Sequence, residues 1–300
     1  MLNNKLYTFL EVARTRSVSA AAKNLNLTQP AASQHIKLLE QQLNTKLYVR
    51  SENGIKLTNT GEIVLKYANR MANIYNTLIE EIKGAKNQTR SLVIGVTQTV
   101  EFGIISEILA EFCTQHKGTH IKIISDTINN LYNKLKLYEV DVIIVDGNIS
   151  HEENFNRILL ATDYLVYVVG KNDPLAQKSM ISINKLRMQN LILRTKGSST
   201  RELFETCLAR LNDSISNYNV ILEVDNIATI KSLVRHGFGS TVLSHSACVH
   251  DIKKGSLVVV PIENLSMVRE ITIVYHKDFE YTEQIDEIRK MYVARVSAGI

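Results

Sequence analysis

Short polar side chains followed by a cation share one face of a predicted helix that begins after Thr28. The outward residues are Gln29, Pro30, Ser33, Gln34 and Lys37. Amides and hydroxyls near a helix N-terminus can hydrogen-bond to base edges, and a cation further along can contact phosphate. These residue types therefore predict a surface that reads DNA. The alternative is an ordinary amphipathic helix whose polar face is only solvated.

Two short helices around a tight turn must position this polar face. Helical periodicity places small or aliphatic side chains on one face of each helix: Val18, Ala21, Ala22 and Leu25 in the first, and Ala32, Ile36, Leu39 and Leu43 in the second. Residues 25–27 make the turn. Thr28 is the expected N-cap, and Pro30 lies in the first turn, where a missing N–H costs little. This pattern predicts a helix-turn-helix.

A β-hairpin is predicted directly after the second helix. Residues 47–50 and 55–58 are short runs rich in strand-forming residues, and the segment between them ends in Asn-Gly, a strong hairpin signal. Such a wing would carry Arg50 and Lys56 beside the duplex. Cations in this position chiefly bind phosphate and fix the register of the protein on DNA.

One long helix is predicted over residues 60–86, with no proline and no glycine between Gly61 and Gly84. Its apolar positions recur every three or four residues: Ile63, Tyr67, Met71, Ile74, Leu78 and Ile82. A seam this narrow favours packing against a partner helix over burial in a core. We therefore interpret residues 60–89 as a linker and dimerisation helix between two domains.

The chain resembles the LysR-type transcriptional regulators over essentially all 300 residues. The resemblance begins with S-V-S-A-A-A-K-N-L-N-L-T-Q-P-A-A-S-Q-H-I-K-L-L-E and continues through L-Y-V-R and L-T-N-T-G-E. Gln34 stands where many members carry arginine, and Tyr48 replaces the more usual phenylalanine. The resemblance implies a winged helix-turn-helix in residues 1–59 and a C-terminal effector-binding domain in residues 90–300. It also implies a homodimer that assembles into a tetramer.

Charge divides the chain in the same way. Residues 1–90 carry 13 Lys and Arg against 6 Asp and Glu, whereas residues 91–300 carry 22 against 24. The cation excess is thus confined to the segment with the helical pair, as expected of a domain that binds a polyanion. Long apolar runs and a signal peptide are missing from the sequence, so we expect a cytoplasmic protein without membrane contact. The three cysteines are far apart and are expected to be reduced.

Strand and helix signals alternate from residue 91 onward. β-branched runs at 92–96, 121–124 and 142–145 are separated by helical stretches, which predicts βαβ units and a parallel sheet. A second group of strands follows at 165–169, 191–194, 220–224, 240–243 and 257–260, before a strand at 271–275 and a final helix return to the first group. The family resemblance implies two α/β subdomains of the periplasmic-binding-protein type, about 90–161 with 268–300 and about 162–267.

Two hydroxyl-rich turns are the candidate effector site. Thr97, Gln98 and Thr99 follow the first strand, and Ser198, Ser199 and Thr200 occupy the matching place in the second subdomain. Hydroxyls and unpaired N–H groups at helix starts favour a small anion such as a carboxylate or oxyanion. The second turn resembles the family's G-S-G-T-R, with Ser199 replacing the second glycine. Plain N-capping by Thr99 or Ser199 is the competing explanation; Asn226, Arg194 and Asp146 are further candidates.

The favoured hypothesis is a transcriptional regulator whose binding to promoter DNA responds to a small-molecule effector. As an activator it would also contact RNA polymerase. The rivals are a DNA-binding protein whose C-terminal domain only oligomerises, and an enzyme built on a binding-protein-like fold. The enzyme has no support in the sequence, because the eight histidines form no metal-binding pattern and neither a phosphate loop nor a nucleophile elbow is present. We expect no catalytic residue, no metal and no cofactor.

Overall fold

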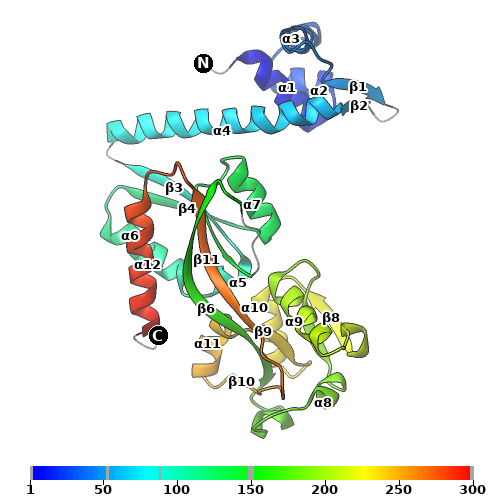
Figure 1. Cartoon of the computed structure of the whole chain (residues 1–300), viewed down its shortest axis with the longest axis vertical. Coiled ribbons are helices and arrows are strands. Elements are labelled where there is room, and N and C mark those ends of the chain that lie inside the picture. Colours follow the sequence, from blue (N-terminus) through cyan, green and yellow to red (C-terminus); the bar gives the residue numbers. More distant parts are fainter. Residues whose placement is uncertain (1–2, 52–53, 88, 148–151, 298–300) are drawn as a thin grey trace. The chain divides into compact units, whose positions relative to one another are not determined.

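A computed structural model describes residues 3–51, 54–87, 89–147 and 152–297, without the side chains of residues 50, 51 and 85–87. The chain forms two compact units (Figure 1). The N-terminal unit contains Met1–Ser91 with Lys136–Glu139, and the C-terminal unit contains Leu92–Leu135 with Val140–Ile300. Among the described residues, no helix is both long enough and apolar enough to cross a membrane.

The N-terminal unit is a winged helix-turn-helix, as the sequence predicts. Its helices are α1 (Asn4–Thr15), α2 (Val18–Asn24), α3 (Gln29–Gln42) and α4 (Asn59–Asn87), and its wing is β1 (Tyr48–Ser51) paired antiparallel with β2 (Gly54–Leu57). Phe9, Ala21, Ile36 and Ala68 meet in the core, so α1 to α4 share one apolar centre. Leu43 is an exception to the predicted buried face: α3 ends at Gln42, and Leu43 is 45% exposed.

Two local interactions fix the recognition helix. Thr28 caps α3, since its hydroxyl oxygen accepts from the Ala31 N–H at 3.3 Å. His35 Nδ1 lies 2.8 Å from the buried Thr8 hydroxyl and joins α3 to α1. The wing is joined to α1 as well, because the Ile55 N–H donates to the carbonyl oxygen of Arg16 at 3.4 Å.

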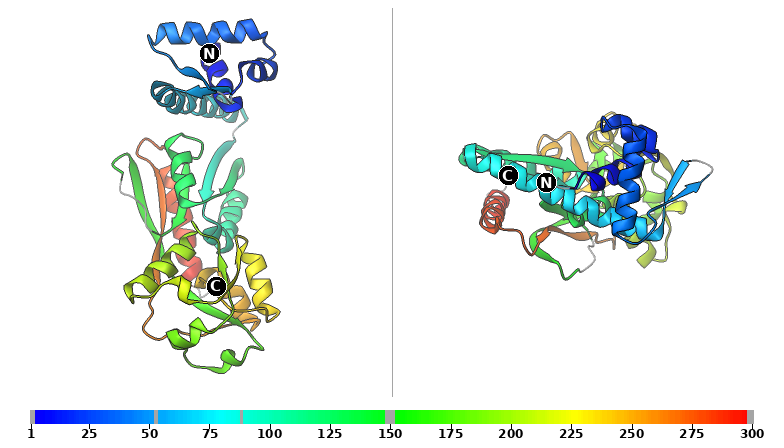
Figure 2. Two further views of the ribbon diagram at one scale, coloured as in Figure 1. Left: turned by 90° about the vertical axis from the view of Figure 1, so that its right-hand side faces the viewer. Right: turned by 90° about the horizontal axis from the view of Figure 1, so that it is seen from above.

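The C-terminal unit has two subdomains that share long strands. β6 (Phe155–Gly170) and β11 (Val268–His276) pair antiparallel and run side by side in Figures 1 and 2. The sheet of the first subdomain continues from β11 through β5 (Val142–Asp146) and β3 (Arg90–Val96) to β4 (Thr119–Ser125). In the second subdomain β6 pairs with β9 (Thr241–Ser244) and β10 (Leu257–Val259), while β7 (Leu191–Arg194) pairs with β8 (Val220–Val224).

The predicted parallel pairing is confirmed for β3 with β5, and β7 with β8 is parallel as well. The sheet as a whole is nevertheless mixed, because β11 is antiparallel to both β5 and β6. The first half of β6 was not predicted. Between Phe155 and Tyr164 only Phe155, Leu160 and Asp163 are buried, so this half lacks the continuous apolar run found at 165–169.

Helices cover both faces of the first subdomain's sheet. α6 (Ile105–Gln115) and α12 (Thr282–Ser297) bury Phe112 and Ile288 against one face, and α7 (Ile128–Lys136) buries Leu131 and Leu135 against the other. In the second subdomain α9 (Ser199–Arg210) packs on one apolar cluster, whereas α10 (Ile227–Arg235) and α11 (His245–Lys253) pack on another. The remaining α-helices are α5 (Gln98–Phe102) and α8 (Ile183–Arg187), and two short 3-10 helices lie at Pro174–Gln177 and Ile215–Asn217.

Candidate functional site

The polar face predicted on α3 is open to solvent. Exposed side chains include Thr28, Gln29, Pro30, Ser33, Gln34 and Lys37. Lys56 is exposed on the wing strand β2. Arg50 lies on β1, but its side chain and the turn residues Glu52 and Asn53 lie outside the described residues. Ala32, Ile36 and Leu39 on the apolar face of α3 are buried, so the polar side of the recognition helix is the side that faces solvent.

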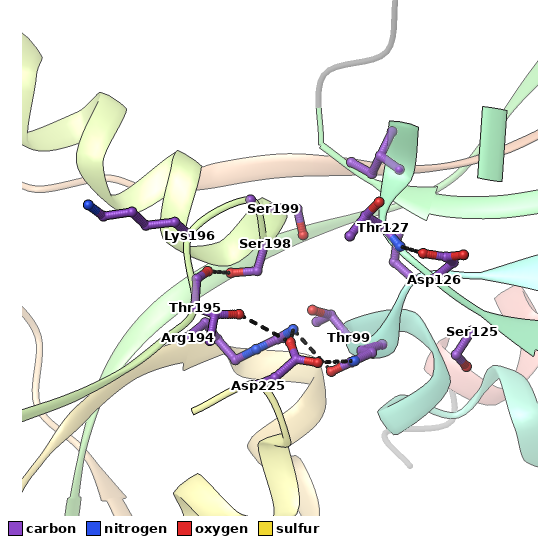
Figure 3. Close-up of a pocket in the computed structure, with 14 residues that line it drawn as sticks. Thr99, Ser125, Asp126, Thr127, Arg194, Thr195, Lys196, Ser198, Ser199 and Asp225 are labelled. Atoms are coloured by element: carbon purple, nitrogen blue, oxygen red, sulfur yellow. Dashed lines mark hydrogen bonds and ion pairs between the residues drawn. The ribbon is translucent and has the colours of Figure 1, made fainter. Parts of the chain in front are cut away.

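A pocket of about 170 Å³ lies between the two subdomains of the C-terminal unit (Figure 3). Four strand ends supply its lining: Thr97, Gln98 and Thr99 after β3; Ser125, Asp126, Thr127 and Ile128 at β4; Arg194 through Ser199 after β7; and Asp225 after β8. The carboxyl ends of strands in α/β domains carry loops and helix N-termini rather than packed side chains. The fold therefore directs polar groups from both subdomains into one crevice.

Arg194 is the buried cation of this pocket. Its side chain is 5% exposed, and Nη2 donates to Gln98 Oε1 at 3.0 Å and to Asp225 Oδ1 at 3.1 Å. Asp225 also accepts from Gln98 Nε2 at 2.9 Å and from the Thr195 hydroxyl at 3.3 Å. The hydrogen bond from Gln98, together with that from Arg194, lowers the pKa of Asp225 against the opposing effect of burial. A charged, hydrogen-bonded cluster thus joins the two subdomains at the pocket.

Asp126 is the second carboxylate in the lining. It accepts from Lys134 Nζ at 2.8 Å, from Asn130 Nδ2 at 2.7 Å and from the Thr127 N–H at 2.8 Å. Burial acts to raise the pKa of Asp126, but the hydrogen bonds from Lys134 and Asn130 outweigh it and lower the pKa. Asp126 is therefore a fixed anion with its own counter-ion.

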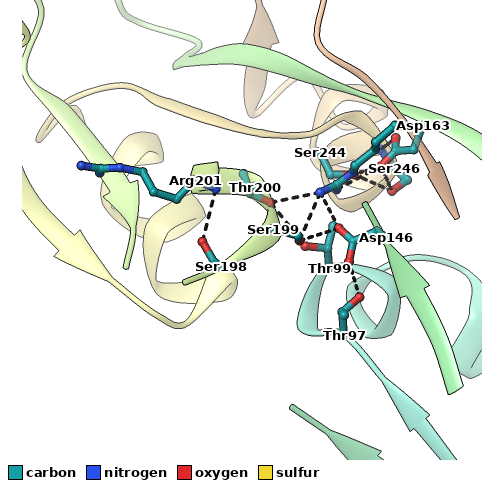
Figure 4. A network of polar contacts seen from close by, with 11 residues as sticks. Thr97, Thr99, Asp146, Asp163, Ser198, Ser199, Thr200, Arg201, Ser244 and Ser246 are labelled. Atoms are coloured by element: carbon teal, nitrogen blue, oxygen red, sulfur yellow. Dashed lines mark hydrogen bonds and ion pairs between the residues drawn. The ribbon is translucent and has the colours of Figure 1, made fainter. Parts of the chain in front are cut away.

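A second charged cluster is buried between the subdomains and shares Thr97 and Ser199 with the pocket lining (Figure 4). Arg269 on β11 is 2% exposed and forms ion pairs with Asp146 on β5 and, at 3.2 Å, with Asp163 on β6. Asp146 also accepts from the hydroxyls of Thr97 and, at 2.9 Å, Ser199. Asp163 also accepts from Ser244 and Ser246. The cluster ties the shared strands to the N-terminus of α9, from which Ser199 reaches the pocket lining.

Five of the seven predicted effector residues lie in the pocket lining: Thr97, Gln98, Thr99, Ser198 and Ser199. Thr200 is buried instead, with its hydroxyl 3.4 Å from Arg269 Nη1. Asn226 caps α10 by accepting from the Thr229 N–H at 2.9 Å, and the preceding residue, Asp225, is the one in the lining.

Capping is carried out by residues other than those suggested from the sequence. Ser198 caps α9 by accepting from the Arg201 N–H, and Thr97 occupies the N-cap position of α5 without a side-chain cap bond. Thr99 and Ser199 are therefore not explained by N-capping. Asp126, Lys196 and Asp225 were not among the predicted site residues. Asp225 directly follows a predicted strand, and Asp126 and Lys196 each lie two residues after one, so the strand-end rule applied to every strand would have found them.

The described part of the structure contains three free cysteines, of which Cys113 is partly exposed. No group of three or more His, Cys, Asp or Glu side chains there could hold a metal ion. Cys207 and Cys248 are buried free thiols, and burial raises the pKa of Cys248 to about 12. These cysteines pack as small apolar residues.

Comparison with known proteins assigns both parts of the chain to one family. Residues 3–62 match the bacterial regulatory helix-turn-helix protein, lysR family, and residues 85–296 match the LysR substrate binding domain. A probable RuBisCO transcriptional regulator from Trieres chinensis is 27% identical over 280 residues, covering 92% of this chain and 91% of the relative.

Solved structures of other proteins have the same fold. CbnR, a LysR family transcriptional regulator, matches with a TM-score of 0.70 at 17% identity, and the match covers 97% of this chain and 99% of the CbnR chain. The CcmR regulatory domain from Synechocystis PCC6803, solved in complex with 2-PG, has a TM-score of 0.59 at 22% identity and covers 68% of this chain and 96% of its own. The winged helix-turn-helix, the two-subdomain C-terminal unit and these matches agree, and the chain belongs to the LysR family of transcriptional regulators.

Proposed function

We propose that this regulator binds double-stranded promoter DNA through α3 and its wing. In this proposal Gln29, Ser33 and Gln34 contact base edges, with Thr28 and Pro30 at the helix start, while Lys37, Arg50 and Lys56 contact phosphates. The exposed polar face of α3 and the net charge of +7 in residues 1–90 support it. We assign DNA binding to residues 1–59, the linker helix to 60–89 and effector binding to 90–300.

We also propose that α4 forms the dimer contact. Six apolar side chains on this helix are each between 46% and 57% exposed: Ile63, Tyr67, Met71, Ile74, Leu78 and Ile82. A monomer would leave this continuous seam in water, and a second copy of the helix would bury it. Two recognition helices could then enter successive major grooves about 34 Å apart. Dimers would pair as tetramers in the cytoplasm, and an activating complex would contact RNA polymerase.

The effector site in this proposal is the pocket between the subdomains, and the effector is a small carboxylate or oxyanion. The observation that carries it is a buried arginine, Arg194, among hydroxyls from two helix starts. Guanidinium and hydroxyl groups suit carboxylate and phosphate recognition. The complex of the related CcmR domain with 2-PG gives independent support. An effector changes DNA binding only if it favours one arrangement of the protein over another.

The test is DNase footprinting of the full-length protein on its own upstream region, with and without a panel of small carboxylates and oxyanions that includes 2-PG. One compound should alter the footprint and, at 100 times its Kd, stabilise the native protein by ~2.7 kcal/mol. Thr99→Val, in the lining, should abolish both effects. Thr114→Val, at an exposed position on α6 away from the pocket, is the matched control. Full response in Thr99→Val would move the effector site elsewhere, and no response to any compound would favour a C-terminal domain that only oligomerises.

A further inference from the structure

The two ends of the Arg194–Asp225 ion pair differ sharply in exposure. Arg194 is 5% exposed and Asp225 is 62% exposed. A guanidinium stays charged in proteins and is costly to leave buried without an anion, whereas an exposed carboxylate can return to water at little cost. The pair can therefore open in only one practical way, by release of Asp225 while another anion replaces it at Arg194.

Arg194 also has hydrogen-bonding capacity that Asp225 does not use. Of the guanidinium nitrogens of Arg194, Nη2 donates to Asp225 Oδ1, and Nε has no hydrogen-bond partner within the described part of the chain. Arginine binds carboxylate and phosphate best through two parallel N–H donors, and an unmatched buried donor is unfavourable. An incoming oxyanion that uses Nε and Nη2 together would satisfy the guanidinium more fully than Asp225 does.

The remaining partners of Asp225 are those that an anionic ligand would use. Gln98 Nε2 at 2.9 Å and the Thr195 hydroxyl at 3.3 Å both donate to this carboxylate. Gln98 belongs to the first subdomain, whereas Thr195, Arg194 and Asp225 belong to the second. Asp225 thus already makes the bridge between subdomains that a bound carboxylate or phosphate would make.

The charges of the pocket also favour an anionic ligand over a cationic one. The lining contains Arg194 and Lys196 against Asp126 and Asp225, so it is formally neutral. Asp126 has Lys134 as its own counter-ion. A cation bound to Asp225 would compete with the donors on Gln98, Arg194 and Thr195 for this carboxylate. It would also weaken the ion pair between Asp225 and Arg194, which has no other anionic partner in the described part of the chain. An anion that displaces Asp225 leaves Arg194 paired.

We propose that the Asp225 carboxylate is an internal anion at the Arg194 site and that the effector is a small carboxylate or oxyanion that displaces it. This inference rests on the proposed function of the pocket as the effector site. It makes Asp225 an autoinhibitory residue, because its contact with Arg194 and Gln98 sets how much effector is needed.

The test compares full-length wild-type protein with Asp225→Asn, which keeps the shape and the hydrogen-bonding oxygen but removes the charge. Glu223→Gln is the matched control: Glu223 lies two residues earlier, is 41% exposed, pairs with the buried Arg201 at 3.4 Å and is outside the lining. Inorganic phosphate and sulfate are the probes, each titrated against sodium chloride at equal ionic strength. The thermal unfolding midpoint gives the apparent Kd.

We expect Asp225→Asn to bind phosphate or sulfate about tenfold more tightly than wild type. This factor corresponds to the lower end of the range expected when one hydrogen bond to a charged group is lost. Glu223→Gln should match wild type, and Arg194→Gln should lose binding. Unchanged or weaker binding by Asp225→Asn would overturn the inference. It would also be overturned if phosphate and sulfate stabilised neither wild type nor Asp225→Asn more than chloride does.

Failure of the inference can be told apart from failure of the proposed function. If a neutral or cationic compound alters the footprint and requires Thr99, while Asp225→Asn gains no affinity for oxyanions, the pocket is an effector site but Asp225 is not an internal anion. If compounds of every charge leave the footprint unchanged, the proposed function itself is wrong.

Discussion

Replacement of Arg269 by methionine should strongly destabilise the C-terminal unit. The guanidinium is 2% exposed and pairs with Asp146 and Asp163, which are 0% and 5% exposed. Methionine has a similar length without charge or donors, so Arg269→Met leaves two buried carboxylates without their cation. Breaking a buried ion pair by removing one partner costs ~3–5 kcal/mol, chiefly because the remaining charge stays buried.

Hydroxyl donors compensate part of the cost of the two unpaired carboxylates. Asp146 keeps the hydroxyls of Thr97 and Ser199, and Asp163 keeps those of Ser244 and Ser246. Neutral donors compensate an ion only partly, so we retain ~3–5 kcal/mol for both carboxylates together. For a unit of this size each kcal/mol shifts the unfolding midpoint by ~2–4 °C, which gives a loss of ~6–20 °C.

Differential scanning calorimetry of the full-length protein measures this shift. Arg295→Met is the control, because Arg295 also contacts two carboxylates, Glu107 at 3.0 Å and Glu111, but is 26% exposed with partners 69% and 38% exposed. Exposed pairs contribute ~0–1 kcal/mol. The triple variant Arg269→Met, Asp146→Asn, Asp163→Asn should regain most of the loss. If Arg269→Met shifts the midpoint no more than Arg295→Met, or if the triple variant is no better than the single one, the buried-charge reasoning is refuted.

Three further changes test other parts of the chain. Gln29→Ala should weaken binding to the specific site by ~1–3 kcal/mol, and an equal loss on random DNA in a gel-shift titration would contradict base reading. Ile74→Glu places a charge in the exposed seam of α4 and should give a monomer in sedimentation equilibrium, whereas an intact dimer would place the contact elsewhere. Hydrogen bonds from Arg14 and Asn24 lower the pKa of Glu11 from 4.5 to about 2. The stabilising effect of ionised Glu11 is therefore complete at a pH above the pKa of this group in the unfolded chain, and it is lost as the pH falls towards about 2. Urea midpoints of wild type and Glu11→Gln should converge across that window, and a constant difference would exclude this linkage.

Local signals predicted the DNA-binding unit well. The cap at Thr28, the buried alanines of α2 and the hairpin after Leu47 all depend on residues within a few positions of each other. Leu43 was misplaced because periodicity does not state where a helix ends, and the left-handed Asn44 follows directly. Short-range chemistry was thus sufficient except at an element boundary.

The candidate effector site was only partly predictable, because its charges pair over long sequence distances. Arg269 and Asp163 are 106 positions apart, and Gln98 and Asp225 are 127 apart. The sequence shows each of these residues as an isolated charge or amide near a strand. The meeting of Arg269 with Asp163 depends on β11 pairing with both β5 and β6. The return of residues 271–275 to the first group of strands was predicted, but its antiparallel direction was not.

The two charged bridges between the subdomains suit different tasks because they differ in burial. Arg269 binds carboxylates that have almost no access to water. Separating the Arg269 bridge therefore costs much free energy, and the bridge holds the shared strands in register. The Gln98–Asp225 bridge ends on a carboxylate that is mostly exposed, so solvent or a competing anion can take its place. Because a ligand shifts an equilibrium only through its differential affinity, it acts most effectively where the competing internal contact is weak. An effector should therefore rearrange the subdomains at the Asp225 bridge while the Arg269 cluster stays closed, and Arg269 variants should lose stability without gaining affinity for oxyanions.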